Sequence, residues 1–141
     1  MNAENTNYKG LAIILHSGSF DRIYHALSLA LAALALGREV RLFVTYWTLE
    51  YMRKENPSVF DLDKEAEDHL KILEGNLKNG HIHKISELIT NTKAMGGKIF
   101  ACTGSMGMLN ISRDELIPEV DMSMGITTFL TETSLDQILF I

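Results

Sequence analysis

The sequence lacks the features that would direct a chain outside a reducing compartment, into a membrane or onto nucleic acid. It has one cysteine, which excludes a disulfide within the chain and fits a reducing compartment. Its most apolar run, residues 27–36, covers about half of the roughly 20 residues that a membrane-spanning helix needs. The net charge of −5 and the lack of any Lys/Arg block give no general attraction to nucleic acid or anionic lipid. We therefore expect a cytoplasmic protein with no nucleic-acid partner and no membrane partner.

The first nine residues are polar and contain no hydrophobic stretch of the kind found in signal peptides. We expect residues 1–9 to form a flexible tail and residues 10–141 to form a single domain. With 141 residues, 46% hydrophobic and 22% charged, the chain has the size and composition of one globular domain. A domain of this length buries about two thirds of its unfolded surface, so its core needs no disulfide.

Short apolar runs alternate with helical patterns along the chain. The first runs are continuously apolar, which is typical of parallel strands that helices cover on both faces. We expect strands at 10–16, 39–46, 98–102, 120–124 and 137–141. We expect helices at 21–36, 48–54, 85–95 and from 61 or 63 to 77, a helical turn near Leu116, and a helix or extended segment at 125–133. The alternation predicts a three-layer α/β/α sandwich with a mainly parallel sheet.

Local signals at the ends of these elements complete the prediction. Asp21 is placed to cap the first helix, and Gly37 to end it in the left-handed conformation. Thr48 is placed to cap the short helix that Asn56-Pro57 ends. The second half of the first helix is apolar nearly all round, so we expect another subunit to cover part of it. The stretch 47–80 is too long for a plain crossover, and we interpret it as a helical insertion that acts as a lid or an interface.

The only cysteine stands where a strand meets a turn of small residues. Cys102 ends the run 98–102 and is followed by Thr103, Gly104 and Ser105. Sites in parallel sheets form at the carboxyl ends of the strands, and a helix that begins there favours a thiolate through its N–H groups and dipole. Free cysteine is also among the most buried residue types, so the same position fits an inert core residue. Spacing alone leaves both interpretations of Cys102 open.

Two other segments carry weaker signals. The turn Ser17-Gly18-Ser19 follows the first strand and could bind an anion, but it lacks the glycine spacing of nucleotide-binding loops. A flavin or nucleotide site there is therefore only a minor alternative. His81 and His83 could form half of a metal site, yet no third ligand lies near them in the sequence. We expect no metal and no other cofactor.

Several segments resemble the DsrE/DsrF-like sulfur-relay family. The stretch Ala101-Cys102-Thr103-Gly104-Ser105-Met106 is similar to the Ala-Cys-x-x-Ser-Met motif of an archaeal and bacterial branch. The turn Arg113-Asp114-Glu115-Leu116 resembles that branch's Arg/Lys-Asp/Glu-Glu/Asp-Leu turn. The stretch Leu42-Phe43-Val44-Thr45-Tyr46-Trp47-Thr48-Leu49 resembles its Phe-x-Thr-Phe-Trp-Gly-Leu segment. Residues 125–130 and 139–141 also fit, so the resemblance runs along nearly the whole chain and is weakest at 56–83.

This resemblance implies a parallel five-stranded α/β fold and assembly into homo-oligomers, either trimers or hexamers. It also implies a sulfur carrier or sulfurtransferase, in which Cys102 takes up sulfane sulfur as a persulfide or thiosulfonate and passes it on. The partners would be sulfur-donor and sulfur-acceptor proteins. The residues that we assign to binding the anion are Thr103, Gly104, Ser105, Ser17 and Gly18. The residues that we assign to an apolar wall around the sulfur are Trp47, Met106 and Met108. The alternative is a structural or regulatory subunit in which Cys102 is inert, because several family members lack the cysteine.

Overall fold

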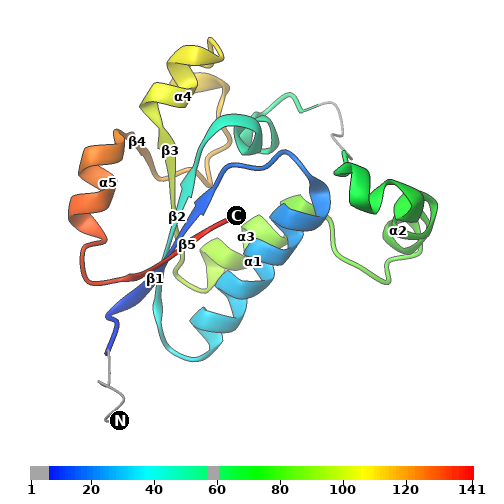
Figure 1. The fold of residues 1–141 in the computed structure, drawn as a ribbon, viewed down its shortest axis with the longest axis horizontal. Helices are drawn as coiled ribbons and strands as arrows, with labels where there is room; N and C mark the ends of the chain where they lie inside the picture. Colours follow the sequence, from blue (N-terminus) through cyan, green and yellow to red (C-terminus); the bar gives the residue numbers. More distant parts are fainter. Residues whose placement is uncertain (1–6, 57–60) are drawn as a thin grey trace.

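A five-stranded parallel sheet forms the centre of the computed structural model, which describes residues 7–56 and 61–141 (Figure 1). The strands follow the order β4-β3-β2-β1-β5 across the sheet, and every neighbouring pair is parallel. Their bounds are β1 Gly10–Leu15, β2 Glu39–Val44, β3 Lys98–Cys102, β4 Met122–Met124 and β5 Gln137–Phe140. The predicted parallel sheet is confirmed, and each expected strand is present.

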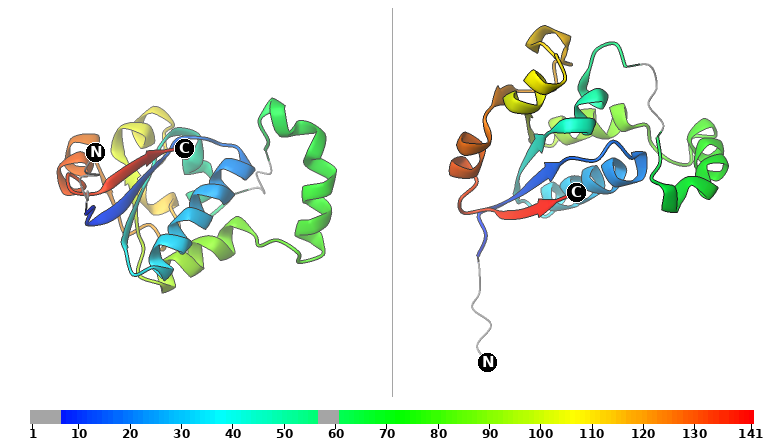
Figure 2. Two further views of the ribbon diagram at one scale, coloured as in Figure 1. Left: turned by 60° about the horizontal axis from the view of Figure 1, so that its bottom comes forward. Right: turned by 45° about the horizontal axis from the view of Figure 1, so that its top comes forward.

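Helices cover both faces of this sheet. α1 (Phe20–Ala35) and α3 (Ile85–Ala94) pack side by side on one face, and α5 (Ile126–Glu132) lies against the other (Figures 1 and 2). Residues 125–133, for which the sequence allowed either a helix or an extended segment, therefore contain a helix. α4 (Thr103–Met108) continues directly from β3 at the carboxyl edge of the sheet. No helix in the described part of the chain is long and apolar enough to span a membrane.

The pleat of the strands divides the core into two unequal clusters. Successive side chains on a strand point to opposite faces of the sheet. In β3, Ile99 and Ala101 therefore join the larger cluster, which α1 and α3 cover, whereas Phe100 and Cys102 join the smaller one. We call the smaller cluster the α5 cluster, because Phe129 of α5 closes it. Its buried members are Ala12, Phe43, Phe100, Cys102, Met124 and Phe129.

Two of the predicted helix caps are wrong. α1 begins at Phe20, so Ser19 holds the cap position, and Asp21 accepts a hydrogen bond from the Ser19 hydroxyl inside the first turn. The helix around Thr48 is a 3₁₀ helix, η1 (Tyr46–Met52), which starts before that residue. Thr48 is buried and its hydroxyl donates to the Ser17 carbonyl, so it joins η1 to the end of β1. Gly37 follows α1 with a φ of +78°, as predicted.

The segment between β2 and α3 contains two further helices, η2 (Lys64–His69) and α2 (Leu70–Lys78). The single helix predicted from 61 or 63 to 77 is thus divided into a 3₁₀ part and an α part. α2 has no buried residue and projects away from the sheet (Figure 2). Arg22 of α1 pairs with Asp63 and Glu65 and so ties the start of η2 to α1. The role of this insertion as a lid or an interface stays a prediction.

Two predicted features fall outside the described residues wholly or in part. They are most of the tail 1–9 and Pro57 of the break at Asn56-Pro57. Within the described residues, α3 is the neighbour that packs along α1. Three leucines of the apolar second half of α1 are partly buried against the larger cluster, and Leu36 after it is exposed. The expected cover of α1 by another subunit stays a prediction.

An ion pair anchors the start of β3 to the segments on either side of it. The Asp121 carboxylate, just before β4, accepts a hydrogen bond from Lys93 Nζ of α3 at 2.6 Å. It also accepts one from the Ile99 N–H of β3 at 2.8 Å. Burial opposes the charge on Asp121, but the Lys93 ammonium and the Ile99 N–H outweigh it and lower the pKa of the carboxyl. This pairing fixes the strand that carries Cys102 at its other end.

We predict that Asp121→Asn destabilises the chain in a pH-dependent way. Because the folded pKa of Asp121 is lowered, its contribution is present above the ordinary aspartate pKa of about 4 and is lost as pH falls through the folded pKa. The expected loss at pH 7 is about 1–2 kcal/mol of unfolding free energy. Urea titrations of both proteins from pH 7 to pH 3 measure it. The exposed carboxylate Asp68 gives a control, Asp68→Asn, and an equal loss in that variant would contradict the prediction.

Candidate functional site

Three loops meet at the edge of the sheet where the parallel strands end. Leu15 of β1 pairs with Val44 of β2, and Val44 pairs with Ala101 of β3. The strand ends are therefore level, and the turn after β1, the start of η1 and the start of α4 share one edge (Figure 1). This is the edge at which sites form in open parallel sheets. The structure thus places Cys102 and the small residues after it on the same edge as the turn Ser17-Gly18-Ser19, in which the sequence also indicated a possible site.

Cys102 is the last residue of β3 and also the cap residue of α4. Its neighbour across the β3–β4 ladder is Met124, and the residue is only 2% exposed. Its side chain belongs to the α5 cluster, in which Phe129 stacks on Phe43 with ring centroids 4.4 Å apart. Phe129 also meets the Phe100 ring edge-on at 6.5 Å. The sulfur therefore lies in a buried, largely aromatic environment rather than in an open cleft.

The cover over the sulfur is thin on the side of α4. A Cβ atom at Gly104 would lie 3.8 Å from Cys102 Sγ, which is ordinary van der Waals contact. Thr103 and Gly104 are themselves exposed. One turn of backbone with small side chains therefore separates the thiol from solvent, and the anion-binding role assigned to these residues stays a prediction.

Ser105 has a buried hydroxyl that lacks a partner. The residue is 2% exposed, and its Oγ has no hydrogen-bond partner among the described residues. A buried hydroxyl without a partner costs free energy, so such groups in folded proteins call for an explanation. Ser105 lies in the first turn of α4, where backbone N–H groups also have no partner within the helix. The turn after Cys102 thus offers donors that the folded chain does not use itself.

The predicted apolar wall is built from different residues. Met106 packs in the larger cluster, not in the one that holds Cys102, because the turn of α4 directs it to the opposite face. Met108 is 66% exposed and Trp47 is 52% exposed. The residues packed with the sulfur are Phe43, Phe100, Met124 and Phe129. The alternation along residues 98–102 could have pointed to Phe100, but no local signal points to the other three.

Ser17 and Gly18, which were assigned to anion binding, support the neighbouring loop in the structure. The Ser17 Oγ accepts a hydrogen bond from the Ser19 N–H at 3.0 Å, and the Gly18 carbonyl accepts one from the Tyr51 hydroxyl at 3.0 Å. A Cβ atom at Gly18 would lie only 3.0 Å from the Cβ atom of Trp47. Glycine is therefore needed for the close approach of η1. The turn holds η1 in place, and the binding role assigned to it stays a prediction.

Four aromatic rings line the same edge beyond this turn. The His16 ring lies 4.6 Å from the Tyr46 ring and 5.6 Å from the Phe140 ring, and Tyr46 meets Trp47 edge-on. Tyr46 has a φ of +42°, a left-handed conformation that costs a residue with a side chain about 1 kcal/mol or more. The sequence analysis assigned only Trp47 of these four. A positive φ at tyrosine has no sequence signature, so this conformation of Tyr46 could not be predicted from the sequence.

The two histidines considered as metal ligands have other neighbours. His83 Nδ1 lies 3.1 Å from Glu87 Oε2, and His81 Nδ1 lies 3.4 Å from Asn76 Oδ1. Across residues 7–56 and 61–141, no three His, Cys, Asp or Glu side chains gather as a metal site would require.

The sequence matches the model of a protein family. The model of the DsrE/DsrF/DrsH-like family matches residues 7–72 and residues 66–140. The two segments together span nearly the whole chain and include Cys102.

Individual relatives resemble the chain over most of its length. The sequence is 26% identical over 146 residues to the uncharacterized protein YrkE of Bacillus subtilis (strain 168). The alignment covers 88% of this chain and 91% of YrkE. The fold resembles the ychN protein from E. coli, with a TM-score of 0.64 and 16% identity over 94% of this chain and 99% of that one. It also resembles BT1422 from Bacteroides thetaiotaomicron, a conserved protein of unknown function, with a TM-score of 0.61 and 15% identity over 99% of this chain and 100% of that one. Structural matches at this identity support the fold alone.

We predict that Phe129→Leu exposes the thiol of Cys102 to solvent reagents. Phe129 is 1% exposed, and shortening it removes the stack on Phe43 at a cost of about 1–2 kcal/mol. Local opening over Cys102 should then become about 5- to 30-fold more frequent. The rate at which an aromatic disulfide reagent labels the thiol measures this opening.

The matched control is Tyr8→Leu, which also replaces an aromatic ring by leucine, at a residue that is 49% exposed and lies outside the α5 cluster. Its labelling rate should stay within about twofold of that of the unchanged chain. If Tyr8→Leu accelerates labelling as much as Phe129→Leu does, the α5 cluster does not shield the sulfur.

Proposed function

The chain belongs to the DsrE/DsrF/DrsH-like family, and on this premise we propose that it carries sulfur between proteins. Cys102 accepts a sulfane sulfur, holds it as a persulfide or thiosulfonate, and gives it to a thiol of an acceptor protein. The observation that carries the proposal is the place of the only cysteine, at the carboxyl end of β3 beneath the small residues of α4. A protein with this activity is a sulfurtransferase.

The chemistry is thiol exchange at sulfur. The Cys102 thiolate attacks the outer sulfur of a donor persulfide, the bond between the two donor sulfurs breaks, and the donor leaves as a thiolate. With a donor thiosulfonate, R–S–S–SO₃⁻, the thiolate attacks the sulfane sulfur that bears the SO₃ group, the bond from that sulfur to the donor cysteine breaks, and the donor leaves as a thiolate. An acceptor thiolate then attacks the sulfane sulfur bonded to Cys102 Sγ, and Cys102 leaves as a thiolate. Each step forms one bond and breaks one, so the pair of steps requires no added oxidant or reductant.

The turn after Cys102 suits an anion at the end of the cysteine. The terminal sulfur of a persulfide carries a negative charge, and donors that already point toward it stabilise it without reorganisation. The backbone N–H groups of the first turn of α4 and the unpartnered Ser105 hydroxyl are the available donors. The aromatic side chains of the α5 cluster keep water away from the sulfur. We assign anion binding to Thr103, Gly104 and Ser105 on this basis.

Access to the sulfur requires movement of α4. Cys102 is nearly fully buried, so a donor cannot reach Sγ while Gly104 covers it. Gly104 and Gly107 each weaken a helix by about 1 kcal/mol relative to alanine, and α4 has only six residues. A short helix with two glycines opens at little cost, whereas β3 beneath it stays paired on both sides. Local opening of α4 would therefore admit a partner thiol without unfolding the sheet.

We also propose that the chain assembles into a homo-oligomer, a trimer or a hexamer, through the face that carries α5. β5 exposes Ile138 and Phe140 on this face, in register with Ala12 and Ile14. Ile126 and Leu130 of α5 are also exposed. Exposed apolar residues gathered on one face are typical of protein interfaces. A partner subunit there would lie beside the α5 cluster and extend the cover over Cys102.

A structural or regulatory subunit is the second candidate function. The observation that favours it is the burial of Cys102, since a thiol that is 2% exposed is also what an inert core cysteine would show. In that case the assembly through α5 and β5 would be the function, and Cys102 would only fill the core.

We predict that a sulfane donor adds one sulfur atom to the chain when it is a polysulfide and an S–SO₃ group when it is a thiosulfonate, and that Cys102→Ser abolishes the addition. Intact mass spectrometry without reductant, after incubation with a polysulfide or a thiosulfonate, measures it. Mass added equally to both proteins, or to neither, would contradict the sulfur-carrier function, and the second result would favour the structural subunit. The same sample under native conditions reports the assembly, where a monomer would contradict the proposed oligomer.

A surface cysteine provides the matched control for this experiment. Ser134 is exposed, so Ser134→Cys in the Cys102→Ser background moves the thiol to open solvent. Sulfur loaded there should be lost to free thiols much faster than sulfur loaded on Cys102. Equal loss from the two positions would show that the surroundings of Cys102 do not protect its sulfur.

A further inference from the structure

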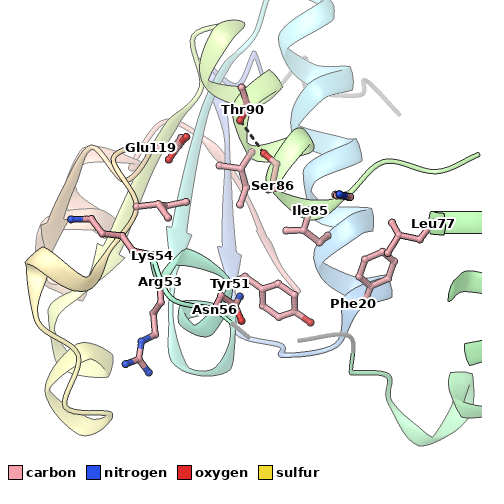
Figure 3. Close-up of a pocket in the computed structure, with 13 residues that line it drawn as sticks. Phe20, Tyr51, Arg53, Lys54, Asn56, Leu77, Ile85, Ser86, Thr90 and Glu119 are labelled. Carbon is pink, nitrogen blue, oxygen red and sulfur yellow. Dashed lines mark hydrogen bonds between the residues drawn. The ribbon is translucent and has the colours of Figure 1, made fainter. Parts of the chain in front are cut away.

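A cavity lies on the other side of the sheet from the thiol. It has a volume of about 520 Å³ and opens between the end of η1, the start of α1 and the start of α3 (Figure 3). Small-molecule sites in proteins typically measure about 300–1,000 Å³. Leu77 of α2 also borders it, so the insertion helps to form the cavity. Cys102 faces the α5 cluster and plays no part in it.

The inner wall of the cavity is apolar. Phe20 at the start of α1 and Ile85 and Ile89 of α3 line it, with Leu77 and Ile117 at its sides. Ile85 and Ile89 are buried residues of the larger cluster, which means that the rear of the cavity is the core itself. Tyr51 adds a phenol, and burial raises its pKa to about 12, so this ring carries no charge at neutral pH. An occupant would therefore need an apolar body.

The cavity also holds a polar atom that the chain leaves unused. Asn56 lines the cavity beside Tyr51, and its Oδ1 is buried without a hydrogen-bond partner in the described structure. Burial of a polar atom without a partner is costly, and native structures rarely accept it. Because a side-chain amide can be turned over, Asn56 can donate to a ligand or accept from it. This orphaned amide points to a ligand with at least one polar group.

The charges at the mouth favour an anion at one end of the cavity. Arg53 is paired with Glu50 and Glu115, so its charge is already balanced. The charge of Lys54 interacts favourably with the carboxylate of Asp114 and helps to lower its pKa. Glu119 is the acidic residue in the lining of the cavity. Lys84, just before α3, has no ion pair or side-chain hydrogen bond within residues 7–56 and 61–141. Lys84 directly precedes Ile85 of the apolar wall and supplies a positive charge at that end of the cavity, whereas Glu119 lies toward Thr90, away from Ile85 (Figure 3).

We propose that this cavity binds a small amphipathic carboxylate. The apolar body of the ligand packs against Phe20, Ile85 and Ile89, its carboxylate pairs with Lys84 at the mouth, and Asn56 hydrogen-bonds a polar atom of the ligand. This site is separate from Cys102, so the proposal does not depend on the sulfur-carrier function. It gives the chain a ligand-binding function on the face opposite to the thiol.

Decanoate, decanol and decylamine, used below the concentrations at which they aggregate, test the proposal on the full chain. Isothermal titration calorimetry should give saturable binding of one decanoate per chain, about three- to fivefold tighter than decanol, with decylamine weaker still. Lys84→Gln should reduce the affinity for decanoate to that for decanol. The absence of saturable decanoate binding, or equal affinity for all three probes, would overturn the proposal.

Two substitutions on α3 locate the site. Ser86 lines the cavity and is exposed, so Ser86→Trp fills the space with little disturbance of the core and should abolish decanoate binding. Asn91 is exposed on the same helix but does not line the cavity, so Asn91→Trp should bind as the unchanged chain does. Thermal melts confirm that both variants are folded. Binding that survives Ser86→Trp, or is lost equally in both variants, would place the ligand elsewhere and overturn the proposal.

Discussion

The pleat of β3 decides which of two cores receives the cysteine. Side chains alternate along the strand, so Phe100 and Cys102 share one face while Ile99 and Ala101 share the other. The parallel pairing with β2 and β4 then places Cys102 beside Met124 and level with the end of β2. A register shift of one residue would move the thiol into the larger core beneath α1 and α3. The anchor between Asp121, Lys93 and Ile99 opposes such a shift at the other end of the strand.

Two opposing requirements meet at the sulfur. Under the proposed function, a stored sulfane sulfur would need shelter from water and small thiols, and the α5 cluster would give that shelter through Phe43 and Phe129. A relay also needs a way in for the partner, and the small residues of α4 leave only a thin cover there. β3 pairs with a strand on each side below Cys102, whereas α4 above it has only six residues, of which Gly104 and Gly107 are glycines. A subunit docked on the α5 face would add to the cover over Cys102, because the exposed residues Ile138 and Phe140 lie on that face.

The sheet could be predicted from the sequence more completely than the site. The run Lys98–Cys102 was located to the residue, because two glycines precede it and small residues follow it. The helix Ile126–Glu132 could not be decided, since its threonines fit a strand equally well and the packing of Phe129 on Phe43 settles it. The surroundings of the sulfur could not be predicted either, because they depend on which face each element covers. That is why Met106 was assigned to the sulfur although it packs in the larger core.

The central claim is that a buried cysteine shelters a transferable sulfur, and the rate of sulfur removal by cyanide tests it most directly. Cyanide converts sulfane sulfur to thiocyanate, which can be followed by its coloured iron complex. On the chain loaded at Cys102, removal should be at least about tenfold slower in the native state than in urea, because cyanide must wait for α4 to open. Glutathione persulfide in the same urea corrects for the effect of the solvent. Equal rates on native and unfolded loaded chain would contradict the claim.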